Sequence, residues 1–553
     1  MPARDKLAIV REYHDQTKHH FTRYARSLGY LDWATQPEPF RSFDGCRRVG
    51  LEEPLGAAGA SAPEGAATWR DVSYDGLFER ASLRPAVGPG LPAVALFLRY
   101  SLGLSAWKQA GPSRWALRVN PSSGNLHPTE GYVIVGPDVA GAEPGVYHYA
   151  PDAHALEERC VFDAAAWRAA VDGLPEGSFF AALTSIHWRE AWKYGERAFR
   201  YCQHDVGHAV AAMRMAAALA GWSCAILPGW TSRDLAALVG VDREADVADA
   251  EAEEPACLLV VSPGPRPPLR SGGLWSAAAA AVLAGAVRGG TWSGRASRLS
   301  ADRVQWDWID AAAEASRDDG DRVAASAAAI ARSAAPSRAA ETPAANLLLE
   351  RRSAQSMDGT TSIGIESFAS ILRRLMPGAG PPFDALWWTP RLHLVLFVHR
   401  VDGLQPGLYA LVRTEAAIGA LRGLFSQDFA WIRPPGMPDD LAFFLLDQGD
   451  CRGVARRLSC GQDIAADGCF SLGMIAEFDA ALAEGGPAAY RRLFWEAGVV
   501  GQALYLEAEA AGLRGTGIGC FFDDGVHQLL GITDHILQSL YHFTVGGPVD
   551  DPR

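Results

Sequence analysis

Lys193 and Tyr194 are adjacent residues whose side chains can carry a proton when their environment shifts their pKa values. Neighbouring cations favour the neutral, basic form of a lysine, and three arginines are close in sequence: Arg189, Arg197 and Arg200. Such an environment would let Lys193, beside Tyr194, act as a base. The alternative is a solvated helix face, on which Glu196 pairs with the arginine one turn later.

A basic segment with a hydroxyl group, "ERRSAQ", occupies residues 350–355. Guanidinium forks and hydroxyl groups bind phosphate oxygens well. We therefore predict that Arg351, Arg352 and Ser353 hold an anionic group. The alternative is an exposed basic pair at the start of a helix.

Two further segments could bring the backbone close to a ligand. One is a polar turn before the β-branched run 132–135, and it comprises Pro121, Ser122, Ser123, Gly124 and Asn125. The other is "GTGIGCFFDD", residues 515–524, from which we select Gly517, Ile518 and Gly519. The alternatives are an ordinary Ser/Asn/Gly loop and a flexible turn that leads into Asp523 as a helix cap.

Composition limits the possible functions of this 553-residue chain. The net charge of −13 argues against a nucleic-acid-binding surface. We expect no membrane span, and residues 1–21 lack the apolar core of a signal peptide. The nine cysteines form no C-x-x-C pair, which predicts reduced thiols in a cytoplasmic protein. We expect no metal site, because His204 and His208, four residues apart, lack an H-E-x-x-H core.

Two parts of the chain resemble each other. The turn "PGVYHY" at 144–149 returns as "PGLYAL" at 406–411, each time after an apolar strand. Three glycines also recur with spacings of 14 and 19 residues: Gly207, Gly221 and Gly240, then Gly498, Gly512 and Gly531. Repeated landmarks in one order predict two copies of one α/β unit, with helices over a mixed sheet.

The predicted organisation has four parts. Residues 1–69 form an N-terminal helical extension, whose first helix runs from Asp5 to about Ser27. The first unit covers 70–270 and the second covers 342–553. Between them, residues 271–341 form an alanine-rich helical linker, with an amphipathic helix at 306–315 and a connector at 318–342.

Four motifs carry a resemblance to a known family: the turn at 121–125, "ERRSAQ", "GTGIGCFFDD" and "WKYGERAFRYCQHDVGHA" at 192–209. In these motifs the chain resembles the FMN-dependent nitroreductase superfamily, and within it the SagB-type branch of thiazoline and oxazoline dehydrogenases. The resemblance implies an α+β fold, with two tandem nitroreductase-like α/β sandwich domains that form a pseudo-dimer within the chain. It also implies FMN as the cofactor and the Lys-Tyr pair as the proton carrier.

Nitroreductases build two flavin sites between two subunits, so the resemblance implies that the turn of the first unit completes the Arg-Arg-Ser segment of the second. The second unit has "FDALW" at 383–387 in place of the turn, with Asp384 repulsive to phosphate. The first unit has Arg80-Ala81-Ser82 but "GWSCAILPGW" in place of the glycine-rich segment. We therefore expect one flavin site per chain.

Three functions are compatible with these motifs. The first is an FMN-dependent dehydrogenase that oxidises a peptide-derived azoline, with oxygen as the final acceptor. The second is a nitroreductase or quinone reductase that uses NAD(P)H, and the third is a non-catalytic scaffold that binds a peptide. We expect a small-molecule or peptide substrate and biosynthetic partner proteins, and leave further dimerisation of the chain open.

Overall fold

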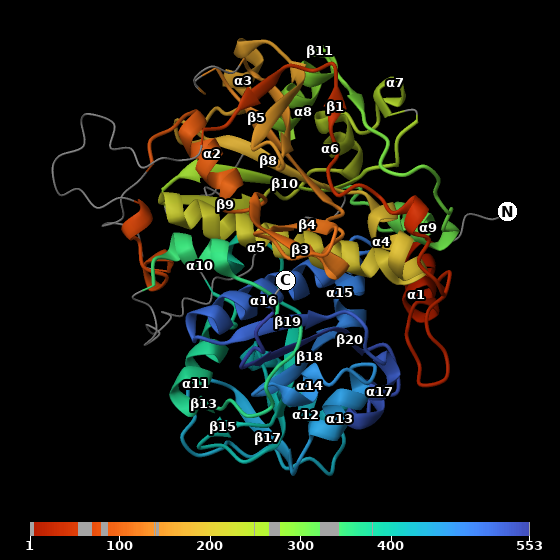
Figure 1. Cartoon of the computed structure of the whole chain (residues 1–553), viewed down its shortest axis with the longest axis vertical. Coiled ribbons are helices and arrows are strands. Elements are labelled where there is room, and N and C mark those ends of the chain that lie inside the picture. The colour runs from red at the N-terminus through yellow and green to blue at the C-terminus, as the bar shows by residue number, and fades with distance from the viewer. Residues whose placement is uncertain are drawn as a thin grey trace.

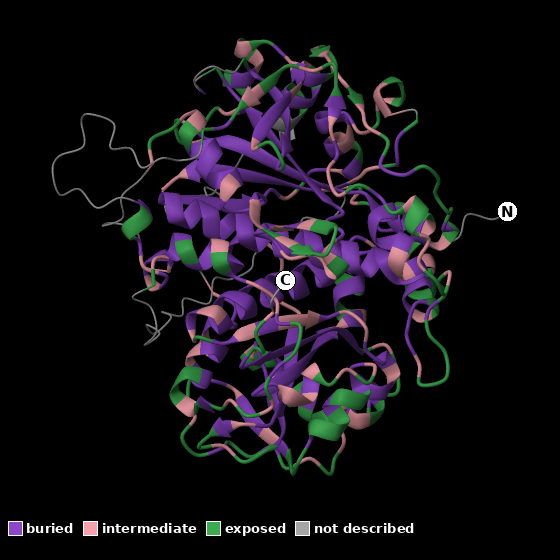
Figure 2. Ribbon diagram, viewed as in Figure 1, coloured by how far each residue is buried: buried purple, intermediate pink, exposed green. Residues whose placement is uncertain are grey.

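The computed structural model describes residues 5–52, 69–78, 87–137, 139, 143–247, 249–264, 277–320, 342–378 and 380–551. Two halves lie one above the other in Figure 1, and two long helices run between them: α5 (Ala198–Ala220) and α16 (Ala489–Ala510). Every residue of α5 is buried, and Figure 2 shows this buried layer across the middle of the molecule. The halves therefore share one interior, as a pseudo-dimer within one chain does.

The first half contains an eight-stranded sheet in the order β11-β7-β6-β5-β8-β10-β9, with β2 also paired to β7. Every pair in it is antiparallel. Its strands are β2 (Arg48–Gly50), β5 (Thr129–Val135), β6 (Gly145–Ala150), β7 (Ala155–Val161), β8 (Phe179–Ser185), β9 (Trp222–Ile226), β10 (Glu254–Pro263) and β11 (Thr291–Trp292). Two of these strands lie outside the unit predicted at 70–270, because β2 precedes it and β11 follows it.

The second half contains a six-stranded sheet in the order β17-β16-β14-β18-β20-β19, again with antiparallel pairs only. Its strands are β14 (Leu392–Val398), β16 (Gly407–Leu411), β17 (Phe443–Gln448), β18 (Phe470–Glu477), β19 (Arg514–Ile518) and β20 (Leu537–Gly546). The order β16-β14-β18-β20-β19 repeats β6-β5-β8-β10-β9, which confirms the repeated unit. The predicted mixed sheet is wrong, because every pair in the two large sheets is antiparallel, including pairs such as β8–β10 and β14–β18 that long connections join.

The remaining elements cover the sheets or lie at their edges. The other helices are α1 (Lys6–Gln16), α2 (Leu91–Arg99), α3 (Ala164–Ala170), α4 (His187–Tyr194), α6 (Ser232–Val239), α7 (Glu244–Val247), α8 (Ala277–Arg288), α9 (Asp307–Ala315), α10 (Ala344–Glu350), α11 (Ile365–Arg374), α12 (Ile418–Leu424), α13 (Arg452–Leu458), α14 (Ile464–Asp467), α15 (Phe478–Gly485) and α17 (Asp523–Leu530). Three small sheets pair β1 (Phe43–Asp44) with β12 (Arg295–Ala296), β3 (Leu104–Ala110) with β4 (Ser113–Arg118), and β13 (Ile363–Gly364) with β15 (Val401–Asp402).

The first glycine of each repeated set lies where α5 and α16 cross. A Cβ atom on Gly207 would lie 2.2 Å from the carbonyl oxygen of Trp495, and one on Gly498 would lie 2.2 Å from that of His204. No side chain fits at such distances, so the two helices approach each other backbone to backbone. The recurrence of these glycines in the sequence therefore has a packing cause.

The other repeated glycines end helices. These glycines are Gly221, Gly240, Gly512 and Gly531. Each has a positive φ of 71° to 78° and lies at the end of a helix, where a left-handed backbone favours glycine. Gly221 and Gly512 follow the two long helices, while Gly240 and Gly531 follow the short helices α6 and α17. In each half, the spacing of 14 residues therefore runs from the helix crossing to the end of the long helix. The spacing of 19 residues runs from there to the end of the short helix.

The N-terminal extension differs from the prediction. Its helix α1 ends at Gln16 and not near Ser27. The side chain of Thr17 ends the helix by donating to the carbonyl of Tyr13 at 2.7 Å. The helix joins the two halves, because Tyr13 Oη donates to the carbonyl of Glu196 and Arg11 pairs with Asp479.

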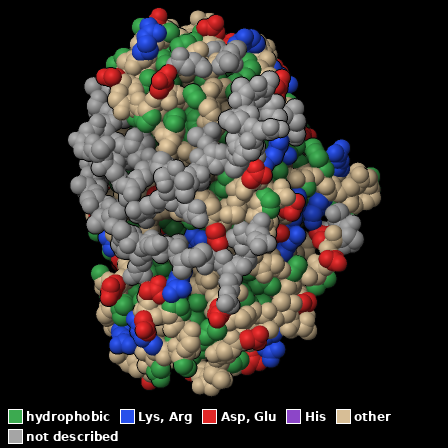
Figure 3. All heavy atoms as spheres, turned by 90° about the vertical axis from the view of Figure 1, so that its left-hand side faces the viewer, with side chains coloured by type: hydrophobic (Ala, Val, Ile, Leu, Met, Phe, Trp, Pro, Cys, Tyr) green, Lys and Arg blue, Asp and Glu red, His purple; other side chains and the backbone are tan. Residues whose placement is uncertain are grey.

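The linker contains the helix predicted at 306–315, which is present as α9. Most of the connector predicted at 318–342 lies outside the described residues, as does the Arg80-Ala81-Ser82 segment. Figure 3 shows acidic and basic side chains interspersed on one face of the molecule, without a field of a single sign. Among the described helices, none combines the length and apolar character that a membrane crossing requires.

Candidate functional site

A cavity of about 690 Å³ lies between the two halves. This volume is within the range of about 300–1,000 Å³ that small-molecule sites occupy. In the first half, its walls come from the turn before β5 and from the helices α4 and α5. In the second half, they come from α16, from β19 and from the segment that follows α10. All twelve predicted site residues line it: Pro121, Ser122, Ser123, Asn125, Lys193, Tyr194, Arg351, Arg352, Ser353, Gly517, Ile518 and Gly519.

The polar turn is held in shape by its own side chains. Ser122 Oγ accepts a hydrogen bond from the backbone N–H of His127 at 2.8 Å, and Asn125 Nδ2 donates to the carbonyl of Ala116 at 2.9 Å. The Oδ1 atom of Asn125 lies 3.0 Å from His127 Nε2. Both ends of the Asn125 amide therefore have protein partners, and its first role is to shape the turn.

Two buried carboxyl groups lie directly behind the turn. Asp205 Oδ1 accepts from the backbone N–H of Ser123 at 3.2 Å, and Glu190 Oε1 accepts from Ser122 Oγ at 3.4 Å. Burial raises the pKa of Asp205 to about 7, and burial together with the Asp205 charge raises the pKa of Glu190. The second oxygen of each carboxyl group has no hydrogen-bond partner among the described residues. The pair is therefore suited to hold a proton beside the cavity.

Lys193 and Tyr194 end α4 and lie against the tip of the turn. A Cβ atom on Gly124 would lie 2.6 Å from Tyr194 Oη and 3.2 Å from Lys193 Nζ, so both polar heads lie at this glycine. The ring of Tyr194 packs edge-on against Tyr201, with 4.8 Å between centroids, and burial raises the pKa of Tyr194. The adjacent pair thus presents an amine and a phenol to one part of the cavity.

The arginines predicted to act on Lys193 have other partners. Arg189 forms a buried ion pair with Glu130, and Arg197 and Arg200 form ion pairs with Asp523 at 2.9 and 2.7 Å. The alternative pair of Glu196 with an arginine one turn later is also absent, since Glu196 pairs with Arg26. Lys193 instead interacts with Glu190 on the same helix, whose pKa it lowers against the larger effects of burial and Asp205. The predicted arginine environment of Lys193 is therefore wrong.

Asp523 is the centre of an ion-pair cluster and not a helix cap. It is the first residue of α17, whose N-cap residue, Phe522, makes no capping hydrogen bond through its side chain. Burial would raise the pKa of Asp523, but Arg197 and Arg200 lower it well below its usual value. The predicted cap is wrong, because the carboxylate points away from its own helix toward α5.

Arg351 reaches from the second half to the first. Its Nη2 atom donates to the carbonyl oxygens of Arg118 and Val119 at 3.4 and 3.3 Å, and its guanidinium lies 4.8 Å from the ring centroid of Tyr505. Burial lowers its pKa to about 10, so the group stays charged at neutral pH. The Nε and Nη1 atoms have no partner among the described residues. A buried cation with two free donors requires an acceptor, and an anion in the cavity would supply one.

Tyr505 on α16 connects the two predicted segments of the second half, residues 350–355 and 515–524. Its hydroxyl accepts from Ser353 Oγ at 2.9 Å and from the backbone N–H of Gly517 at 3.0 Å. The guanidinium of Arg352 donates to the carbonyl of Leu349 at 2.7 Å. Arg352 is therefore partly used in shaping its own segment, whereas Arg351 is not. The alternative interpretation, an exposed basic pair at a helix start, is wrong for Arg351, because its side chain is 4% exposed.

The glycine-rich segment packs tightly against tyrosines of the cavity wall. A Cβ atom on Gly517 would lie 2.0 Å from Tyr541 Oη, and one on Gly519 would lie 2.5 Å from Cε1 of Tyr201. Packing against the protein itself thus requires these glycines, whether or not a ligand is bound. The flexible turn considered as an alternative is wrong for Gly517, which lies within strand β19.

Several lining residues were not predicted. They are Lys108, Trp115, Leu117, Arg118, Gly124, His127, Tyr201, Asp205, His208, Ala354, Gln355, Gln462, Ile464, Tyr505, Thr516, Cys520 and Tyr541. Tyr201, Asp205 and His208 lie four and three residues apart on α5, so one helix face could have revealed them. Gly124, Ala354, Gln355, Thr516 and Cys520 lie inside the motifs singled out above, whereas the rest come from separate elements and carry no such signal. His204, beside this face, stacks on Tyr541 with 4.1 Å between centroids.

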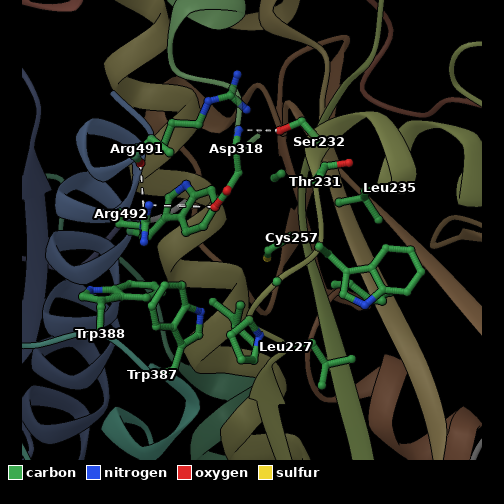
Figure 4. A pocket seen from close by; sticks show the side chains of 18 of the residues that line it. Leu227, Thr231, Ser232, Leu235, Cys257, Asp318, Trp387, Trp388, Arg491 and Arg492 are labelled. Atoms are coloured by element: carbon green, nitrogen blue, oxygen red, sulfur yellow. Dashed lines mark hydrogen bonds and ion pairs between the residues drawn. The ribbon is translucent and has the colours of Figure 1, made fainter. Parts of the chain in front are cut away.

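The position related to this cavity by the repeat is nearly closed. Leu227, after β9, has the same spacing from Gly221 as Ile518 has from Gly512. The cavity that Leu227 lines measures about 40 Å³, and Figure 4 shows Trp387 and Trp388 in it beside Leu227.

The polar groups at this reciprocal position also have partners. Arg492 lies over the ring of Trp387, 5.0 Å from its centroid. Asp384, expected here as a charge repulsive to phosphate, forms an ion pair with Arg214 at 2.8 Å. Since bulky rings and paired charges occupy the space, the two positions related by the repeat are no longer equivalent.

Comparisons with known proteins agree with this architecture. The nitroreductase family model matches residues 110–261 and 451–547. A crystal structure of a candidate nitroreductase from Anabaena variabilis superposes with a TM-score of 0.68 at 20% identity, and the match covers 98% of this chain and 99% of that one. At this identity the superposition supports the fold alone.

Two curated relatives match shorter parts. The trifolitoxin-processing protein TfxB of Rhizobium leguminosarum bv. trifolii is 37% identical over 109 residues, which are 18% of this chain and 29% of that protein. A candidate nitroreductase of Methanocaldococcus jannaschii is 36% identical over 95 residues, which are 16% of this chain and 46% of that protein. The matches thus span less than half of either relative. The two segments that the family model matches therefore show nitroreductase-family sequence in each half of the chain.

Proposed function

We propose that this protein is an FMN-dependent dehydrogenase that oxidises an azoline-type heterocycle derived from a peptide. The observation that carries the proposal is the composition of the cavity between the two halves. Its second-half wall carries the buried Arg351, and its first-half wall carries Lys193, Tyr194 and the polar turn. An anion-binding group and a proton carrier thus meet in one space, although they come from different halves of the chain.

The residues of the cavity fit the cofactor. The two unpartnered nitrogen atoms of Arg351 would bind the phosphate group of FMN, with Arg352 and Ser353 beside them. The turn residues Pro121, Ser122, Ser123 and Asn125, and the Gly517, Ile518 and Gly519 backbone, would surround the ring system. When bound, FMN would supply a hydride acceptor, which no side chain can provide.

The proton chemistry would fall to the chain itself. Oxidation of an azoline releases a proton from the ring, and Lys193 Nζ and Tyr194 Oη lie together at Gly124 to receive it. Glu190 is the charged neighbour of Lys193, and its pKa is raised by burial and by Asp205. A carboxyl pair of this kind could take the proton onward from the lysine.

Support for a peptide-derived substrate comes from the relative that is named for trifolitoxin processing. The corresponding role of this chain is a proposal, as is its cooperation with other biosynthetic proteins. A cavity of about 690 Å³ can hold a flavin ring and a small heterocycle, but not a folded partner. The rest of a peptide would therefore lie outside the cavity.

An anaerobic reduction experiment tests this proposal. Purified protein is loaded with FMN and mixed without oxygen with a short peptide that contains one thiazoline. We expect loss of the oxidised flavin absorbance and a product lighter by two hydrogens. A protein that binds FMN, and that NADPH reduces while thiazoline and oxazoline peptides do not, would contradict the dehydrogenase proposal.

The second candidate is a nitroreductase or quinone reductase that takes hydride from NAD(P)H. The match to the Methanocaldococcus jannaschii relative favours it. Such an enzyme would not need Lys193 or Tyr194, since its flavin exchanges hydride with both substrates. The same experiment therefore decides between the two candidates.

A further inference from the structure

A pair of cysteines lies at the edge of the cavity and takes no part in the function proposed above. Cys520 lines the cavity, directly after Gly519, and Cys460 lies in the loop after α13. Both thiols are partly exposed, and both are free. Each of the two side chains shifts the pKa of the other, so the thiols are near neighbours.

Hydrogen bonds hold together the segments that carry the two cysteines. The N–H of Phe522, two residues after Cys520, donates to the carbonyl of Leu458, two residues before Cys460, at 2.8 Å. Gln462 Nε2, two residues after Cys460, donates to the carbonyl of Cys520 at 3.1 Å. These two contacts hold the loop that carries Cys460 against the segment that carries Cys520.

The surroundings of the two thiols differ. Cys520 lines the cavity, whereas Cys460 is not among the lining residues, and Arg197 Nη2 donates to the carbonyl of the preceding Gly519 at 3.3 Å. Cys460, His19 and Arg197 lower the pKa of Cys520, whereas Cys520 and burial raise the pKa of Cys460. Cys520 is therefore the thiol that a small oxidant in the cavity meets first.

His19 is fixed in place beside Cys520. Its backbone N–H donates to Asp523 Oδ2 at 2.9 Å, and its Nδ1 atom accepts from the N–H of Ala25 at 2.9 Å. The other ring nitrogen, Nε2, therefore carries the proton and is the one free to face the sulfur. His19 is 8% exposed, so its contact with Cys520 is shielded from water.

We propose that Cys520 and Cys460 form a peroxide-reactive redox pair beside the cavity. The Cys520 thiolate attacks one oxygen of hydrogen peroxide, the O–O bond breaks, and a sulfenic acid forms on Cys520. The hydroxide that leaves takes up the proton that the Cys520 thiol had released and becomes water. The Cys460 thiol then attacks this sulfur, the S–S bond forms, and a second water leaves. Two thiols are oxidised and one peroxide is reduced to two waters, so atoms and electrons balance.

The test follows the thiols and needs neither flavin nor substrate. Protein stripped of FMN is titrated with hydrogen peroxide, and the remaining thiols are alkylated and located by peptide mass spectrometry. Cys46 is the matched control, because it is another partly exposed thiol whose pKa is raised, first by burial. We expect loss of both Cys460 and Cys520 thiols together, on the order of tenfold faster than loss of Cys46. A peptide pair linked through Cys460 and Cys520 should appear, with two hydrogens fewer than the reduced pair.

Single variants separate the two roles. Cys460→Ser should leave Cys520 reactive but stop it at the sulfenic acid, which dimedone traps. Cys520→Ser should lower the reactivity of Cys460 to that of Cys46. His19→Gln should slow the oxidation of Cys520 while the linked peptide still forms. Equal rates for Cys46 and Cys520, or no linked peptide in the wild type, would overturn the proposal, whatever the result of the flavin experiments.

Discussion

Arg351 Nη2 donates a hydrogen bond to the carbonyl oxygen of Val119 at 3.3 Å, although 232 residues separate the two in the chain. Val119 lies two residues before the turn that begins at Pro121, so this bond joins the proposed phosphate-binding segment to the proposed ring-binding segment. The bond is long and leaves two other nitrogens of Arg351 without partners. The site is thus assembled by the packing of the two halves, and this contact lies where they meet.

Arg351→Ala should release the cofactor. Charge-assisted hydrogen bonds to a phosphate contribute roughly 1.5–3 kcal/mol each, which corresponds to about tenfold to hundredfold weaker FMN binding. Fluorescence titration of the stripped protein measures this affinity. Arg373→Ala is the control, since Arg373 lies on the surface and pairs with Asp440. Equal FMN affinity in Arg351→Ala and Arg373→Ala would remove Arg351 from the site.

Lys193→Ala and Tyr194→Phe should separate binding from catalysis. Both variants should retain FMN and should still be reduced by dithionite and reoxidised by air. Oxidation of the azoline should fall by about a hundredfold or more, the usual scale for loss of a general base. The double variant should be little worse than the worse single one if the two side chains act as a unit. Full activity in either single variant would show that its side chain carries no proton in the reaction.

Asp205→Asn should change how stability depends on pH. Burial raises the pKa of Asp205 to about 7 in the folded protein, above its value of about 3.9 in an unfolded chain. Between these two pKa values, the Asp205 carboxyl group is protonated in the folded protein and ionised in the unfolded chain. The contribution of Asp205 to stability is therefore complete below pH 4 and is lost as the pH rises toward 7. At one pKa unit per 1.36 kcal/mol, the loss is at most about 4 kcal/mol.

Urea unfolding at pH 5 and pH 8 measures this effect. The decrease in the free energy of unfolding between the two pH values should be smaller in Asp205→Asn than in the wild type. Asparagine keeps the oxygen that accepts from the N–H of Ser123, so the turn should survive. An identical decrease in both proteins would show that Asp205 is already ionised at pH 5.

Gly498→Ala should destabilise the pseudo-dimer. Its added methyl would lie 2.2 Å from the carbonyl of His204, so α5 and α16 would have to separate. Overpacking of this kind costs about 1–3 kcal/mol or more. Gly419→Ala in α12 is the control, because nothing lies within 4 Å of its Cβ position, and there alanine should add about 0.5–1 kcal/mol of stability. A free energy of unfolding that is unchanged or higher in Gly498→Ala would contradict the close crossing.

The repeat was predictable because backbone requirements leave a regular trace in sequence. Gly207 and Gly498 are demanded by the helix crossing, and Gly221 and Gly512 by the helix ends, so their spacing shows one architecture twice. Strand direction left no such trace, which is why the mixed sheet was wrong. The end of α1 was also missed, since a single buried threonine at position 17 ends the helix.

Local motifs identified which side chains meet, but not what surrounds them. The twelve predicted residues lie in four short segments, and the structure brings all four to one cavity. The arginines near Lys193 were assigned to it by sequence distance, whereas Asp523 from the other half pairs with two of them. Contacts between the halves depend on the packing of α5 against α16, and local spacing carries no information about that packing.

The number of flavins per chain tests whether the two halves build a single flavin site. The cavity between the halves measures about 690 Å³, whereas the nearly closed reciprocal position measures about 40 Å³. Protein saturated with FMN, freed of excess ligand and analysed by absorbance should contain one flavin per chain. Ser123→Trp, which places a ring in the cavity, should contain almost none, and Ser113→Trp on the exposed β3–β4 hairpin should still contain one. A value near two, or a value of one that survives in Ser123→Trp, would contradict a single flavin site built from both halves.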